Sequence, residues 1–170
     1  MPNAVQMIRQ DHKKVQGLFK KFDQAKKNAA KKGIADQVIQ ELEVHAKLEE
    51  EIFYPAIRKE LGEDEMLDEA KKEHQQAKDI MRELKTMNGG EDDELEEKFS
   101  ELVECIQHHV EEEEGEMLPK VEESEMDLAD YGEQMSKRKK ELTGGSQTRS
   151  KSKSKRKSKA ASGRRRSRAA

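Results

Sequence analysis

The chain has 170 residues, of which 42% are charged and 4% aromatic, and it contains no tryptophan. Sandwiches and barrels need strands rich in β-branched and aromatic residues, so this composition argues against both and favours an all-α protein. One cysteine, no long apolar run and no secretion signal at the N-terminus predict a cytoplasmic chain without internal disulfides or a membrane-spanning segment.

The net charge of −3 hides a division along the chain. Residues 143–170 contain 11 Lys and Arg and no acidic residue, whereas residues 1–142 contain 23 basic and 37 acidic residues. An acidic body does not attract nucleic acid, but a basic segment can. We therefore expect one acidic folded domain followed by a basic tail.

The first predicted helix begins near Asn3, which is a suitable N-cap. Behind it, core positions recur at alternating spacings of three and four, which predicts an amphipathic helix buried along one side. These positions are Val5, Ile8, His12, Val15, Phe19 and Phe22. Residues 29–35, which include two lysines and a glycine, interrupt the stripe and predict a turn.

A second helical stripe contains two polar residues. Its positions are Val38, Leu42, His45, Glu49, Ile52 and Ala56. Because residues i and i+4 lie on the same face of a helix, His45 and Glu49 can reach one common point. Pro55 predicts that this helix kinks or ends, and the turn residues at 61–64 predict the end of the segment.

Two further stripes carry the same polar residue types. The third consists of Leu67, Ala70, His74, Ala77, Met81 and Leu84, before Asn-Gly-Gly at 88–90. The fourth consists of Leu95, Phe99, Leu102, Ile106, His109, Glu113 and Met117, before Pro119. A weaker pattern over 126–135 predicts a short fifth helix with Ser124 as its cap. Residues 143–170 are predicted to be disordered from their composition.

The four main helices form an internal repeat. Residues 11–22 align with 73–84, and the His-x-x-x-Glu pair at 45 and 49 recurs at 109 and 113. Two similar helical hairpins with short loops predict an up-down-up-down four-helix bundle with approximate twofold symmetry. We expect the bundle over residues 1–120, an additional C-terminal helix over 121–142 and a disordered Lys/Arg/Ser-rich tail over 143–170.

Six polar residues would then converge in the bundle interior. They are His12, His45, Glu49, His74, His109 and Glu113. A single histidine on an apolar stripe is more often a core residue than a ligand. However, two carboxylates and four imidazoles buried without compensation would cost several kcal/mol per ion. A domain stable by roughly 5–15 kcal/mol cannot carry that cost, so the repeated pattern predicts a metal site.

The types of ligand narrow the choice of metal. Imidazoles and carboxylates without thiolate suit iron or manganese, and zinc less well. If both carboxylates bridge, two six-coordinate ions would each keep about two positions for solvent or a small ligand. A structural zinc site would be closed and would need only four of these ligands. We therefore expect an open dinuclear centre.

The order His, His-x-x-x-Glu, His, His-x-x-x-Glu, with the flanking LEEEIFYP and EEEEGEMLP, resembles the hemerythrin-like (HHE cation-binding) family over about residues 1–120. This resemblance implies a four-helix bundle with a non-haem di-iron centre, bridged by an oxo or hydroxo group and by Glu49 and Glu113. The four histidines would be terminal ligands. It also implies O₂, peroxide or nitric oxide as the small ligand, in iron or oxygen sensing, redox stress or iron handling.

One departure from classical hemerythrins concerns a fifth histidine on the third helix. The positions four residues either side of His74 are Ala70 and Lys78. The centre should therefore be more exposed to solvent or have another donor, with Glu73 as a candidate, and reversible oxygen carriage is not favoured.

Two nearby residues have competing interpretations. His108 with Glu112 would form an alternative His-x-x-x-Glu pair, but this register breaks the repeat, so His109 and Glu113 are preferred. Cys105 is interpreted as a small buried apolar residue rather than as a ligand or redox switch.

The tail predicts non-specific contact with nucleic acid, because clustered bases neutralise phosphates and release counterions. The bases concerned are Lys151, Lys153, Lys155, Arg156, Lys157, Arg164, Arg165 and Arg166. Such contact would associate the protein with the nucleoid. A solubilising role, contact with the acidic body and a nuclear-import signal are alternatives.

Two other functions remain open at this point. One is a di-iron enzyme that acts on peroxide or oxidises ferrous iron. The other is a metal-free helical interaction module with a nucleic-acid-binding tail. The sequence does not define an oligomeric state.

Overall fold

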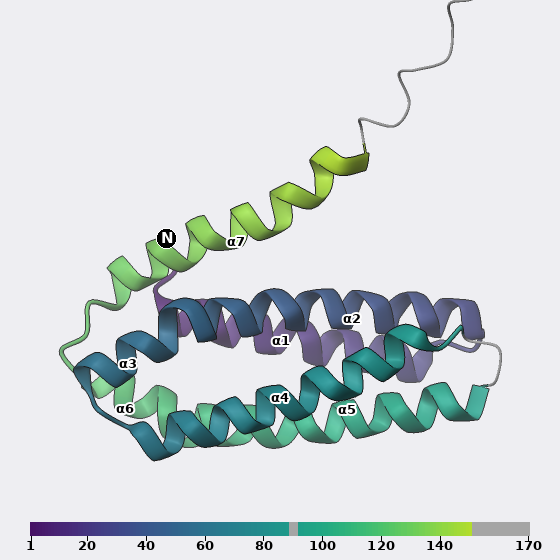
Figure 1. The fold of residues 1–170 in the computed structure, drawn as a ribbon, viewed down its shortest axis with the longest axis horizontal. Coiled ribbons are helices and arrows are strands. Elements are labelled where there is room, and N and C mark those ends of the chain that lie inside the picture. Colours follow the sequence, from purple (N-terminus) through teal and green to yellow (C-terminus); the bar gives the residue numbers. More distant parts are fainter. Residues whose placement is uncertain (89–91, 151–170) are drawn as a thin grey trace, which may run out of the picture.

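The computed structural model describes residues 1–88 and 92–150 of the chain, and these residues form helices and turns without a strand. The bundle is built from α1 (Ala4–Gln24), α2 (Asn28–Leu48), α4 (Asp64–Thr86) and α5 (Asp92–Glu112). Helix α1 packs against α2, and α4 packs against α5, so that two antiparallel pairs form the bundle (Figure 1). The predicted all-α, up-down-up-down four-helix architecture is confirmed.

Asn3 caps α1 as expected. Its side chain accepts a hydrogen bond from the Gln6 backbone N–H at 2.9 Å, and the Gln6 side chain accepts one from the Asn3 N–H at 3.0 Å. This reciprocal arrangement satisfies two donors that the first turn of a helix leaves free.

The predicted turn over residues 29–35 is wrong. Helix α2 begins at Asn28, so the connection from α1 is much shorter than expected. Ala35, Val38 and Ile39 are buried, and burial of this face outweighs the low helix propensity of the exposed Gly33, which costs about 1 kcal/mol relative to alanine.

Neither proline ends its helix. A π-helical turn, η1 (Glu49–Phe53), joins α2 to α3 (Tyr54–Glu60), and η2 (Glu113–Met117) joins α5 to α6 (Leu118–Glu123). Pro55 and Pro119 closely follow these π-helical turns, which shift the backbone hydrogen-bond pattern and bend the helix where each proline lacks an N–H. A kink or a helix end was expected at Pro55, and the structure shows the kink (Figure 1).

The fifth helix is longer than expected. Helix α7 (Leu128–Ser150) packs against α1, α2 and η1. Arg138 pairs with Glu51, and Lys139 pairs with Asp11, so α7 is fixed to the body by ionic contacts. The helix therefore extends past residue 142, where the folded part was expected to end. Residues 151–170 lie outside the described part of the chain.

The start of α7 also differs from the prediction. Ser124 ends α6, where its Oγ donates a hydrogen bond to the Val121 carbonyl at 2.7 Å. The carboxylate of Asp127 accepts from the Asp130 N–H at 3.0 Å and so caps α7 instead. A Cβ on Gly132 would lie 2.7 Å from the Pro2 carbonyl oxygen, so the N-terminus and α7 pack together closely only because this residue is glycine.

Two apolar clusters fill the bundle, one toward each end. One includes Val15, Leu42, Ala77 and Ile106, and the other includes Ile8, Leu48, Ala70 and Met117. On each of the four helices, the predicted site residues fall between members of these two clusters. The polar residues therefore form a layer inside an otherwise apolar core. None of the helices in residues 1–88 and 92–150 combines the length and apolarity needed to cross a membrane.

Candidate metal centre

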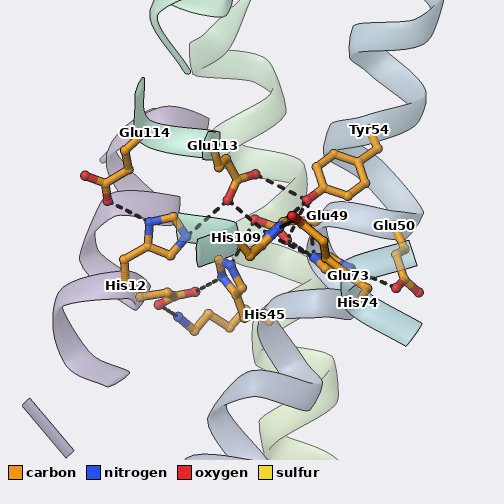
Figure 2. A network of polar contacts seen from close by, with 12 residues as sticks. His12, His45, Glu49, Glu50, Tyr54, Glu73, His74, His109, Glu113 and Glu114 are labelled. Atoms are coloured by element: carbon orange, nitrogen blue, oxygen red, sulfur yellow. Dashed lines mark hydrogen bonds and ion pairs between the residues drawn. The ribbon is translucent and has the colours of Figure 1, made fainter. Parts of the chain in front are cut away.

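The structure brings all six predicted site residues together in this buried layer (Figure 2). Glu49 and Glu113 begin the two π-helical turns, and the histidines come one from each bundle helix. Exposure is 0% for Glu49 and 7% for His45, and the other four fall between these values. Since π-helical turns often mark functional sites, the position of both glutamates at such turns is consistent with a binding role.

One set of ligand atoms comes from His12, His45, Glu49 and Glu113. Each residue contributes one atom, and the four atoms lie within 4.8 Å of one another. His12 Nε2 is 3.2 Å from Glu113 Oε2, and His45 Nε2 is 2.9 Å from Glu49 Oε1. We call this set group A.

A second set comes from Glu49, His74 and His109, again within 4.8 Å of one another. His74 Nε2 is 3.0 Å from Glu49 Oε2 and 3.2 Å from His109 Nε2. Glu113 Oε2 is 3.6 Å from His109 Nε2. We call this set group B. Glu49 belongs to both groups, with one oxygen facing each.

The unpaired atoms of the layer test whether a cation fits. His12 Nε2, His45 Nε2, Glu49 Oε1 and Glu113 Oε2 are all buried and have no hydrogen-bond partner of suitable geometry. Buried polar atoms are rarely left without a hydrogen bond, and here four of them converge on one place and contact only other ligand atoms. Nitrogen and oxygen donors without sulfur suit a divalent iron or manganese ion. The residues therefore fit the metal that the sequence pattern predicted.

Each of the four candidate histidines contacts a carboxylate through its outer nitrogen, Nδ1 (Figure 2). His12 Nδ1 is 2.7 Å from Glu114, and His74 Nδ1 is 2.9 Å from Glu50. The other two contacts join His45 Nδ1 to Asp11 at 3.5 Å and His109 Nδ1 to Glu73 at 2.5 Å. Carboxylates in this position fix the orientation and tautomer of metal-binding histidines. All four Nε2 atoms consequently face the centre.

These contacts also revise the expected role of Glu73. It was a candidate for the donor that replaces the missing fifth histidine, but one of its oxygens contacts the outer nitrogen of His109. The repeat explains this placement, because Glu73 corresponds to Asp11, which contacts His45 in the first hairpin in the same way. Glu73 therefore holds the outer nitrogen of His109 and does not belong to group A or group B.

Tyr54 is the residue that sequence reasoning missed. Its hydroxyl lies 3.1 Å from Glu49 Oε2, 3.2 Å from His74 Nε2 and 3.3 Å from Glu113 Oε1. Leu118 takes the corresponding position in the second hairpin, 64 residues on. A phenol where the repeat has an apolar residue was the available signal, and it places Tyr54 beside group B, which has fewer ligands.

Electrostatics within the layer are strong. Burial alone would raise the pKa of Glu49, but His45 and His74 outweigh it and lower that pKa well below its ordinary value. Burial lowers the pKa of His74, whereas Glu49 and Glu50 raise it, with a net value of about 9. Burial and the nearby carboxylates of Glu113 and Glu49 raise the pKa of Tyr54 well above its ordinary value. The phenol thus keeps its proton.

The remaining candidates are placed as follows. His109 and Glu113 point inward while His108 and Glu112 are exposed, as the preferred register required. Cys105 is half-buried against the apolar core, and its thiol contacts the Glu73 carbonyl oxygen, outside groups A and B. The predicted nucleic-acid contacts between Lys151 and Arg166 lie outside the described residues.

The fold and site define a class of protein: a four-helix bundle whose inward-facing histidines and glutamates form groups that could hold metal ions. The chain belongs to the hemerythrin HHE cation-binding domain family, whose model matches residues 3–121. The resemblance inferred from the two HHE motifs is therefore confirmed.

Three relatives illustrate this membership. The chain is 30% identical over 117 residues to a hemerythrin-like protein of Schizosaccharomyces pombe, which covers 68% of this chain and 57% of that protein. It is 28% identical over 113 residues to a DNA nickase of Nostoc sp.. This match covers 66% of this chain and 32% of the nickase.

The third relative is a crystal structure of a hemerythrin HHE cation-binding domain-containing protein from Mycobacterium kansasii. It matches with a TM-score of 0.75 at 25% identity and covers 90% of this chain and 94% of that one. By contrast, this chain spans only about half and a third of the two curated relatives, so their activities as whole proteins are not transferred to it.

Proposed function

We propose that this chain binds two iron ions and acts in sensing or handling iron, oxygen or a related redox ligand. Group A would hold one ion, and group B with Tyr54 or solvent would hold the other, while Glu49 would bridge them. The main support is the convergence of four buried ligand atoms in group A that have no hydrogen bond and that contact one another in two His–Glu pairs. The imidazole and carboxylate donors favour iron, with manganese or zinc as less suitable occupants.

Iron would supply reversible electron transfer and open coordination positions for a small ligand. The protein's own contribution is to exclude water and to orient the ligand atoms. An apolar cavity of about 30 Å³ adjoins the histidines, between Val15, Ala77 and Met81. It has room for a diatomic molecule, and its apolar lining favours neutral O₂ or nitric oxide over charged species.

The sensing role is tested with iron-loaded protein by following its near-ultraviolet absorption while O₂ or nitric oxide is added to the reduced form. We expect a spectral change that is complete at one equivalent of ligand per centre. The matched variant Ala77→Leu fills the cavity and should slow this change while leaving the iron content intact. An iron-loaded wild-type protein that shows no spectral response to either gas would contradict the sensing role.

A second candidate function is enzymatic turnover of peroxide, and Tyr54 favours it. Heterolytic cleavage of an O–O bond is assisted by a proton donor, and the Tyr54 hydroxyl lies within 3.5 Å of four ligand atoms. If the protein is an enzyme, Tyr54→Phe should lower peroxide turnover by about 10²–10⁴-fold at unchanged iron content. If Tyr54→Phe turned over peroxide as fast as the wild type, Tyr54 would not be the acid. If the wild type turned over peroxide no faster than His74→Ala, the enzymatic role would be excluded.

The basic tail supports a proposal of non-specific nucleic-acid binding. Its 11 bases follow an acidic body, and one relative of the folded domain is a DNA nickase. Deletion of residues 151–170 should abolish binding to duplex DNA at low salt, and binding by the full chain should weaken steeply as salt rises. Equal binding by the truncated protein would contradict this role. The alternative of a metal-free interaction module is tested separately by metal analysis of the purified chain, and bound metal would exclude it.

A further inference from the structure

A third group of potential metal ligands lies on the open side of α4 and α5, outside groups A and B. Glu73, His108 and Glu112 each offer one ligand atom, and the three atoms lie within 4.8 Å of one another. His108 Nε2 is 3.4 Å from Glu73 Oε1 and 3.3 Å from Glu112 Oε1. We call this set group C.

Glu73 distinguishes group C from an ordinary acidic surface. The residue is 7% exposed, and its Oε1 atom is buried without a hydrogen-bond partner of suitable geometry. Its other oxygen is already occupied by His109 Nδ1 at 2.5 Å. This buried carboxylate oxygen has no hydrogen bond and faces only the exposed imidazole of His108 and a second carboxylate, so a divalent cation between the three would satisfy it.

The first hairpin shows what satisfies the corresponding position there. Asp11 matches Glu73 in the repeat and contacts His45 as Glu73 contacts His109. The ammonium of Lys139, on α7, pairs with the outer oxygen of Asp11. Helix α7 packs against α1, α2 and η1 (Figure 1). Among the ion pairs of residues 1–88 and 92–150, Glu73 pairs with histidines alone.

The other two residues of group C are polar, whereas their counterparts in the first hairpin are apolar. His108 and Glu112 are exposed, whereas their counterparts in the first hairpin are Val44 and Leu48, and Leu48 is fully buried. The second hairpin therefore has donor atoms where the first has apolar residues and a lysine from α7.

A groove of about 380 Å³ next to group C reaches the buried centre. Seven glutamates and one lysine line it, and its lining includes Glu73 and Glu112 together with the buried His109 and Glu113. The lysine, Lys120, is already paired with Glu63 at 3.2 Å. A groove lined by one sign of charge concentrates counterions, here divalent cations.

We propose that group C is an accessory divalent-cation site, and that the acidic groove loads metal through it into the buried centre. One imidazole and two carboxylates suit ferrous iron or manganese, with water completing the coordination. The accessory site does not depend on the proposed function. The loading role does, because it requires that the buried centre bind metal. Glu73 would join the two sites, with one oxygen on the accessory ion and the other on His109.

The site is tested by counting bound Mn²⁺ in iron-loaded protein, with free Mn²⁺ measured by electron paramagnetic resonance. The variant is His108→Ala/Glu112→Gln, which removes two exposed donors outside groups A and B. Glu104→Ala/Glu111→Gln changes two exposed residues of the same helix and is the control. We expect the wild type and the control to bind one more Mn²⁺ per chain than the variant.

Equal Mn²⁺ binding by the wild type and the variant would overturn the accessory site. If the buried centre took up no iron, a difference of one Mn²⁺ would still support the accessory site, while the proposed function would fail.

The loading role is tested by stopped-flow uptake of Co²⁺ into metal-free protein, followed by its visible absorption. The His108→Ala/Glu112→Gln variant should fill the buried centre about 10-fold more slowly and reach the same final content. Uptake at the rate of the control would overturn the loading role.

Discussion

Substitution of Glu49 by glutamine should remove most of the metal affinity of the centre while preserving the shape of the side chain. Glu49 is fully buried and is the residue that groups A and B share. Group A would fall from four charged or imidazole ligands to three, and group B from three to two. A charge-assisted contact contributes about 1.5–3 kcal/mol, so each ion should bind at least about 10-fold to 100-fold more weakly.

The same substitution should destabilise the metal-free protein. Glu49 Oε1 lies 2.9 Å from His45 Nε2, and Oε2 lies 3.0 Å from His74 Nε2. Removing one partner of a buried ion pair costs about 3–5 kcal/mol because the other charge is left uncompensated. For a chain of this size, each kcal/mol lowers Tm by about 2–4 °C, which gives a decrease of roughly 6–20 °C.

The assay combines metal analysis after dialysis against a weak chelator with calorimetry of the metal-free protein. Glu51→Gln is a suitable control, because Glu51 lies in the same π-helical turn but is exposed and pairs with Arg138. The control should keep its full metal content. A Glu49→Gln protein with two ions per chain and an unchanged Tm would refute the bridging role.

Three further outcomes are expected. Asp11→Asn should weaken metal binding by about 10–100-fold, measured by chelator competition, because Asp11 orients His45; unchanged affinity would contradict this. Gly132→Ala should lower Tm, because the new Cβ would meet backbone atoms at the start of the chain. Gly17→Ala, whose Cβ would meet nothing within 4 Å, should instead raise the stability by up to about 1 kcal/mol. The opposite order of the two Tm values would show that α7 docks differently. A metal ion must displace a proton from His74, whose pKa is about 9, so the apparent metal affinity should rise about tenfold per pH unit below pH 9. A metal affinity that does not change with pH would contradict this.

The bundle and the six converging residues could be predicted because both depend on periodicity. Spacings of three and four place His12 and His74 on the buried faces, and the 64-residue repeat selects His109 over His108. These are properties of one helix face at a time. They need no knowledge of how the helices are joined.

The rest depended on tertiary contacts. The π-helical turns at Glu49 and Glu113 leave no mark in an apolar stripe, and the proline rule alone does not distinguish a kink from a helix end. Tyr54 reaches the centre only because η1 changes the helical phase just before it. Helix α7 docks on the body through the buried Met135 and through the pairing of Arg138 and Lys139 with acidic residues, which composition cannot reveal.

The most direct test of the metal centre is an anomalous difference map at the iron absorption edge from crystals of iron-loaded protein. Two peaks about 3.5–4 Å apart are expected, one within reach of His12 and His45 and the other within reach of His74 and His109, with Glu49 between them. The absence of anomalous density in this layer, or ordered water in its place in protein that retains iron elsewhere, would contradict the account.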